Sequence, residues 1–281
     1  MVFMVGLIAI SVQSLNAQKK EFTETIEKEI AFTNKADNEF ILQNISGSIT
    51  VEAYSGNTVK LAVEKIVTSR SDEKLALGKK EVGIKVERNA GNITVYPDAP
   101  NLVFKNGSLN TVNCNNYADS GYDYRLNFTV KVPQNSKVEV ATVNHGDIVI
   151  NNMRGEFVKA GNINGHITLN NISGQTEVNA INGEVNISYI SNPKAPSRYY
   201  ALNGDINVKF QRDLSAEIAF KSMNGEFYTD FDIAKQFAKT SRSNGKNAKF
   251  KYEAKPVVQI GSGALDHSFE TLNGNVLINK I

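Results

Sequence analysis

A short motif recurs along the second half of the chain: an aliphatic residue, Asn-Gly, one variable residue and a second apolar residue. An early version, at 143–148, carries one inserted residue, His145. The motif glycines lie at positions 146, 165, 183, 204, 225 and 274, so the steps are 19, 18, 21, 21 and 49 residues. A nearly fixed period is the signature of repeat proteins, in which each unit buries its apolar side against its neighbours. The repeat therefore constrains the fold more than any other feature.

Two architectures fit this repeat. Asn-Gly between alternating apolar residues is a strong hairpin signal, which would give a long antiparallel meander. Alternatively, each unit of about 19 to 21 residues is one coil of a β-solenoid, with two short strands and two turns. A flat meander leaves both faces uncovered and needs another layer, and the sequence contains few helical segments to supply one. We therefore expect an all-β, β-helix-like stack, preceded by a less regular β-rich part.

The motif residues have a structural explanation. Glycine accepts positive φ angles, and asparagine tolerates turn conformations. Stacked coils would bring equivalent Asn side chains to about 4.8 Å, where their amides can bond in a ladder. We expect the aliphatic residues on both sides of Asn-Gly to point into the core. The structural turn residues are Asn144, Gly146, Asn164, Gly165, Asn182, Gly183, Asn203, Gly204, Asn224, Gly225, Asn273 and Gly274.

The chain divides into three parts. Residues 1–17 are apolar, then small and polar, as in a signal peptide, although no Lys or Arg precedes the apolar run. That run is shorter than the roughly 20 residues that span a membrane. Residues 18–130 form an N-terminal β-rich region with a short helix at 71–80 capped by Ser71, a hairpin at 83–97 and a polar insertion at 98–123. Residues 131–281 hold the repeats, with an excursion at 229–268 that contains a hairpin.

Composition narrows the functional classes. The 31 Lys+Arg residues nearly balance the 29 Asp+Glu residues, which argues against a nucleic-acid partner. Cys114 is the only cysteine, so a disulfide within the chain and a thiolate metal cluster are excluded. With the N-terminal segment, this favours an exported bacterial protein located in the periplasm, on the cell surface or outside the cell.

The ordered series of segments resembles a known family. The stretch "YRLNFTVKVPQNSKVEVATVNHGDIVI", the Asn-Gly repeats and the final "TLNGNVLINKI" after "VVQIGSGA" are similar to the bacterial putative-adhesin family of β-strand-repeat proteins, a domain of unknown function. The resemblance covers roughly residues 40–281. It implies an exported or envelope-associated β-rich protein and supplies no catalytic residues. The inserted His145, and His166 and Asn275 at positions where an acid is typical, depart from the family pattern.

Few residues suggest chemistry. Carboxylates stacked about 4.8 Å apart in water repel by roughly 0.9 kcal/mol, so the residues after each glycine are either solvated turn residues or ligands of a calcium ion. We favour the first alternative. His145 and His166 are expected to be neighbouring surface residues, with a metal pair as the alternative. A tyrosine-rich surface, Tyr117, Tyr122 and Tyr124, is a candidate binding patch, with strand packing as the alternative. The residues after the glycines are Asp147, His166, Glu184, Asp205, Glu226 and Asn275.

These observations predict an exported, non-enzymatic, adhesin-like protein that serves as a binding or structural module at the cell envelope. No catalytic residue, cofactor or metal site is expected, and the chain is not expected to be an integral membrane protein. The partner would be an envelope polymer or protein. Two alternatives remain: a polysaccharide-acting enzyme on a β-helix, and an envelope scaffold that assembles end to end.

Overall fold

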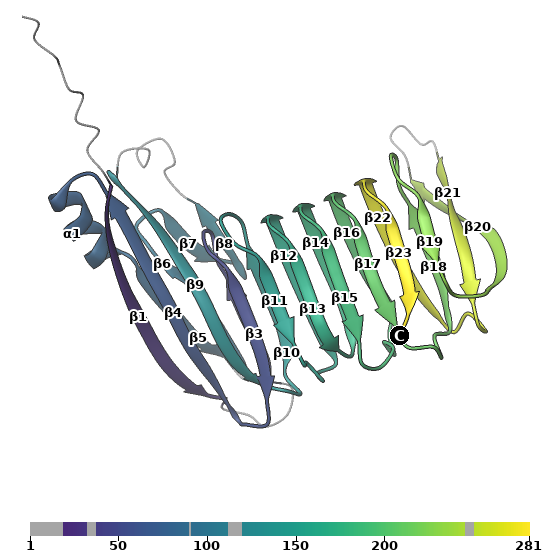
Figure 1. Cartoon of the computed structure of the whole chain (residues 1–281), viewed down its shortest axis with the longest axis horizontal. Coiled ribbons are helices and arrows are strands. Elements are labelled where there is room, and N and C mark those ends of the chain that lie inside the picture. Colours follow the sequence, from purple (N-terminus) through teal and green to yellow (C-terminus); the bar gives the residue numbers. More distant parts are fainter. Residues whose placement is uncertain (1–18, 33–37, 90, 112–119, 245–249) are drawn as a thin grey trace, which may run out of the picture.

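Two long β-sheets face each other and enclose the core in a computed structural model (Figure 1). It describes residues 19–32, 38–89, 91–111, 120–244 and 250–281. The predicted signal segment, Cys114 and Tyr117 lie outside the described residues. No helix among the described residues is long and apolar enough to cross a membrane.

The first sheet, sheet A, has ten strands. In spatial order they are β1 (Lys20–Ala31), β4 (Thr58–Ser69), β9 (Tyr122–Pro133), β3 (Ile49–Tyr54), β11 (Ile148–Asn151), β13 (Ile167–Ile172), β15 (Val185–Tyr189), β17 (Ile206–Phe210), β23 (Val276–Lys280) and β19 (Phe227–Thr229).

The second sheet, sheet B, has eleven strands. Their order is β20 (Ile233–Asn244), β21 (Phe250–Ile260), β18 (Ala216–Lys221), β22 (Leu265–Asn273), β16 (Ser197–Asn203), β14 (Gln175–Asn182), β12 (Phe157–Asn164), β10 (Lys137–Thr142), β2 (Glu39–Gln43), β6 (Asn92–Asp98) and β5 (Gly83–Asn89). A separate hairpin joins β7 (Leu102–Lys105) and β8 (Ser108–Thr111).

Each Asn-Gly motif carries the chain from sheet B to sheet A. β12 leads into β13, β14 into β15, β16 into β17 and β22 into β23, and each strand pairs in parallel with its equivalent in the next coil. An antiparallel meander would instead pair the strands on either side of each motif. The solenoid-like, all-β architecture is therefore confirmed.

The coils do not stack in the order of the sequence. β22 and β23, which come last, lie between the coil of β16 and β17 and the coil of β18 and β19. The step of 49 residues between the last two motifs is the detour that makes this insertion possible. It contains the predicted hairpin, β20 and β21, which extends sheet B beyond β18 (Figure 1).

The core is a set of aliphatic rows that run along the stack. The residues two positions after the motif glycines, such as Ile167, Val185 and Ile206, are fully buried, except Phe227 in the edge strand β19, which is partly buried. Each contributes about 1.5–3 kcal/mol by leaving water. The residues before the motif asparagines were expected to point inward as well, and this is wrong: Ile163 is 42% and Met223 is 73% exposed. Strand alternation explains the difference, because the buried position in β12 is Asn162 and its neighbour must face outward.

The N-terminal end of the stack closes with different elements. β1, β4 and β9 pair antiparallel, and the helix α1 (Asp72–Glu81) packs against them. Ser71 caps this helix through the backbone N–H of Lys74, as predicted, and the predicted hairpin of β5 and β6 also forms. Both sheets continue on either side of residue 130, where the N-terminal region was expected to end.

Candidate functional site

The motif asparagines form one continuous hydrogen-bonded ladder along an edge of the stack. Each amide nitrogen donates to the side-chain oxygen of the preceding coil. The bonds run Asn164 to Asn144 (2.6 Å), Asn182 to Asn164 (2.9 Å), Asn203 to Asn182 (2.9 Å), Asn273 to Asn203 (2.7 Å) and Asn224 to Asn273 (2.8 Å). The order follows space rather than sequence, with Asn273 fifth. Each amide in the interior of the ladder both donates and accepts, so the predicted ladder spans the inserted coil without a break.

The motif glycines form a second column along the stack. Glycine was expected here because it accepts positive φ angles, but the structure shows a different reason. Gly146, Gly183 and Gly225 do not have positive φ angles, and φ at Gly204 is 158°, close to extended. What excludes a side chain is the neighbouring coil: a Cβ on Gly204 would lie 2.2 Å from the carbonyl oxygen of Gly183. The same clash recurs between the other glycines of the column, at 1.8–2.3 Å. Close contact between coils, rather than turn conformation, requires glycine here.

The residues after the glycines serve as caps between coils. Asp147 accepts a hydrogen bond from the backbone N–H of His166 (2.8 Å), and Asp205 accepts one from Asn275 (2.7 Å). His166 uses Nδ1 in the same way, accepting from the backbone N–H of Glu184 (3.0 Å). These bonds give the row a structural role. Within the described residues, no group of three or more His, Cys, Asp or Glu side chains is arranged to hold a metal ion.

The histidines have three different environments. Nδ1 of His145 lies 3.2 Å from the Ser46 hydroxyl, so His145 and His166 bond to different partners. His267 is buried between Tyr199 and Phe210, with its Nδ1 accepting from the backbone N–H of Ser197 (3.1 Å). Its Nε2 is buried without a hydrogen-bond partner among the described residues. Burial lowers the pKa of His267 to about 4, so the folded chain holds a neutral imidazole.

A pair of tyrosines lies next to His267 in the core. The hydroxyls of Tyr189 and Tyr199 are 2.7 Å apart, and both side chains are almost fully buried. Burial raises the pKa of both hydroxyls above the ordinary value, so they remain protonated. Tyr199 also stacks on Phe269, and Tyr189 stacks on Phe210. This cluster is packed core and not an accessible site.

The predicted tyrosine patch takes a different form. Tyr122 is buried and donates its hydroxyl hydrogen to Glu81 (2.7 Å), whereas Tyr124 is half-buried against the core. Both border a hollow of about 580 Å³ that also contains Arg125 and His145. For Tyr122, strand packing prevails over surface display, because alternation along β9 points it inward.

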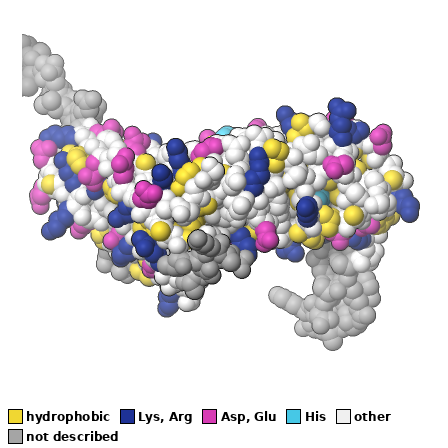
Figure 2. Space-filling view, turned by 90° about the horizontal axis from the view of Figure 1, so that it is seen from below, with side chains coloured by type: hydrophobic (Ala, Val, Ile, Leu, Met, Phe, Trp, Pro, Cys, Tyr) yellow, Lys and Arg dark blue, Asp and Glu magenta, His cyan; other side chains and the backbone are white. Residues whose placement is uncertain are grey.

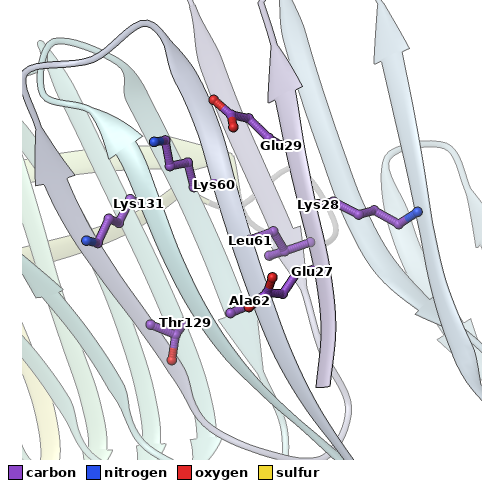
Figure 3. Close-up of a pocket in the computed structure, with 8 residues that line it drawn as sticks. All are labelled: Glu27, Lys28, Glu29, Lys60, Leu61, Ala62, Thr129 and Lys131. Carbon is purple, nitrogen blue, oxygen red and sulfur yellow. The ribbon is translucent and has the colours of Figure 1, made fainter. Parts of the chain in front are cut away.

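A second hollow, of about 420 Å³, lies over β1, β4 and β9 (Figure 3). Glu27 and Glu29 border it from β1, Lys60 from β4 and Lys131 from β9, around the small side chain of Ala62. Lys28 borders the hollow as well, so its lining holds two acids and three bases and carries only a small positive charge.

The outer face of sheet B carries a third concavity, a groove of about 540 Å³ across β10, β12, β14 and β16. Sequence reasoning missed it, although a signal existed. When the repeats are aligned on the motif asparagine, the residues three positions before it form a row across this face. That row is Ala141, Gly161, Asn179, Tyr200, Glu270 and Lys221.

Parallel coils, two facing sheets and continuous side-chain ladders define the class of protein: an all-β, solenoid-like repeat protein. The chain belongs to the Toastrack DUF4097 family, whose model matches residues 19–264. The resemblance inferred from the sequence, to a β-strand-repeat family of unknown function, is confirmed. No curated protein matches the chain.

Two solved structures are similar to it. One is described as a putative cell adhesion protein from Clostridium sporogenes; it is 12% identical, the match covers 94% of this chain and all of that chain, and the TM-score is 0.43. The other is described as a putative lipid binding protein from Parabacteroides distasonis; it is 16% identical, the match covers 92% of this chain and 96% of that one, and the TM-score is 0.28.

Proposed function

We propose that the chain is an exported, non-enzymatic binding or structural module of the bacterial cell envelope. The observation that carries the proposal is the stack itself. Six motif coils are joined by an unbroken asparagine ladder and a column of glycines, so the outward side chains stand at fixed intervals of about 4.8 Å. Such a surface suits a partner that is itself long and repetitive.

The experiment expresses the full chain in a bacterial host and follows three properties. Mass spectrometry of the exported protein should show cleavage near Ala17, in agreement with the apolar N-terminal segment. The purified protein should sediment with isolated cell envelopes and release no reducing sugar from them. An uncleaved chain retained in the cytoplasm would contradict export, and sugar release would contradict the non-enzymatic role.

A scaffold that assembles end to end is the second candidate, and the last coil of the stack favours it. β19 is the edge strand of sheet A, and Met223 and Tyr228 on this coil are 73% and 50% exposed. An unpaired strand edge beside exposed apolar side chains is a template for a further strand. Light scattering over a range of protein concentrations tests this candidate: growing filaments would support it, and a constant monomer mass would exclude it.

A further inference from the structure

The groove on sheet B is open and lies on a rigid floor. Ala141 and Gly161 form this floor, on the strands β10 and β12. Among the described residues, the nearest atom to a Cβ added on Gly161 would be the Cβ of Ala141, at 3.7 Å. Gly161 therefore differs from the motif glycines: no neighbour requires its lack of a side chain, and that lack deepens the groove.

The two walls of the groove differ in chemistry. Along one wall, Glu139, Lys159, Glu177 and Arg198 follow one another in register on four successive strands. Their signs alternate, so the wall has no net charge, and Lys159 bonds to Glu139 at 2.9 Å. The opposite wall is aliphatic and consists of Val143, Ile163 and Ile181, the outward residues before the motif asparagines.

Unused hydrogen-bonding groups lie at one end of the groove. Glu177 and Asn179 on β14 stand beside Arg198 and Tyr200 on β16. Within the described part of the chain, no hydrogen bond or ion pair occupies these four side chains. A carboxylate, an amide, a guanidinium and a phenol thus face solvent together, next to the Ala-Gly floor and the aliphatic wall.

We propose that this groove binds a neutral polysaccharide laid along the stack. The Tyr200 ring and the aliphatic wall match the C–H faces of sugar rings, and the four unused polar groups match hydroxyls. Coils repeat every 4.8 Å or so, and a sugar residue in an extended chain advances by nearly the same distance. The balanced wall offers no attraction to a polyanion or a polycation, and both signs of charge are also interspersed on the face in Figure 2.

Other ligands fit the groove less well. An acyl chain would bury the Glu177 and Arg198 side chains and offer them no hydrogen-bond partner, which is unfavourable. A peptide that adds a strand needs a free sheet edge, whereas β10, β12, β14 and β16 are interior strands paired on both sides. A neutral glycan satisfies both walls at once.

The inference rests on the proposed function, because it names the partner class of the same binding module. The test uses the full chain on an array of neutral, anionic and cationic glycans, followed by calorimetry with a neutral hexasaccharide of the preferred type. Tyr200→Ala removes the ring, and Gly161→Phe fills the groove. Lys209→Ala, on the exposed outer face of sheet A, is the matched control. Circular dichroism and thermal melting verify that each variant folds.

We expect binding to neutral glycans that weakens about tenfold or more in both groove variants and is unchanged in the control. If Gly161→Phe does not fold, Arg198→Ala takes its place. The proposal is overturned if no neutral glycan binds, if the groove variants bind like the parent, or if anionic glycans, acyl chains or peptides are preferred. Sedimentation of the groove variants with cell envelopes distinguishes failure of this proposal from failure of the proposed function. If the variants sediment as well as the parent, the groove is not the binding site, but the proposed envelope role stands.

Discussion

Replacing Gly204 with alanine tests the principle that holds the stack together. The added Cβ would lie 2.2 Å from the carbonyl oxygen of Gly183, whereas an ordinary contact begins at 3.4 Å, so the coils must separate by about 1.2 Å at this point. Both neighbours are backbone, and both take part in bonds between coils: Gly204 N–H to Asn273 O (2.9 Å) and Gly183 N–H to Asn203 O (3.0 Å). The clash therefore cannot be relieved by rotating a side chain.

The expected loss of stability combines two terms. Overpacking costs about 1–3 kcal/mol, and weakening a hydrogen bond between coils adds about 1 kcal/mol, so we expect a total of about 2–4 kcal/mol. For a chain of this size, each kcal/mol lowers the melting temperature by roughly 2–4 °C. Valine at the same position should be at least as destabilising, because it carries the same Cβ and two further methyl groups.

The matched control is Gly161→Ala, within the strand β12 of the same stack, where the nearest atom to an added Cβ, the Cβ of Ala141, lies 3.7 Å away. Alanine restricts the unfolded chain, so this variant should be neutral or more stable by about 0.4–1 kcal/mol. The measurement is thermal and denaturant unfolding of both variants, monitored by circular dichroism. Equal melting temperatures for Gly204→Ala and Gly161→Ala would refute the close-contact explanation of the glycine column.

Three further predictions concern the ladder and the buried polar groups. Asn203→Ala removes two bonds of the ladder and should lower the free energy of unfolding by about 1–2 kcal/mol, measured by denaturant unfolding. Asn144→Ala, at the end of the ladder, removes one bond and should lower the free energy of unfolding by half as much. Equal losses in the two variants would show that the ladder does not stabilise the stack. His267 has a folded pKa of about 4, below its ordinary 6.5, so its neutral form stabilises the fold above pH 6.5 and up to about 3 kcal/mol is lost as the pH falls towards 4. His267→Asn should flatten this part of the stability profile, and an unchanged slope would assign it to other groups. Tyr199→Phe removes the 2.7 Å partner of the buried Tyr189 hydroxyl and should lower the free energy of unfolding by about 1–3 kcal/mol. The double variant Tyr189→Phe/Tyr199→Phe should lose less stability than the sum of the two single variants. Additive losses would argue against a shared hydrogen bond.

The sequence was sufficient for the features that depend on one repeat and its nearest neighbour. A period near 20 residues, Asn-Gly turns and the lack of helical segments predicted parallel coils and an asparagine ladder. Ser71 predicted the start of α1 by capping chemistry. In each case the local sequence pattern strongly favours one conformation. The structure of the rest of the chain is therefore not needed to predict it.

Other features depend on contacts that a repeat pattern does not encode. The outward direction of Ile163 follows from the burial of Asn162 one position earlier, where the amide donates to the backbone oxygens of Gly146 and His166. An apolar residue beside a turn is ordinarily assigned to the core, so hydrophobicity alone gave the wrong side. The groove was missed because its rows appear only when all the coils are placed in register.

The inserted coil sets a limit on how this repeat protein can assemble. In a simple solenoid each coil contacts the coil before it in sequence, and folding spreads from any starting point to its neighbour. Among the described strands, β18 and β19 have parallel partners only in β22 and β23, which follow about 50 residues later in the sequence. The coil of β16 and β17 also pairs with these two strands, on the side opposite the coil of β14 and β15. The last 17 residues of the chain, 265–281, therefore bridge two coils that do not pair with each other, and the ladder from Asn203 to Asn224 exists only through Asn273. Because contacts of high sequence separation form late, the rigid surface on which the proposed binding depends is completed only when the C-terminal strands are in place.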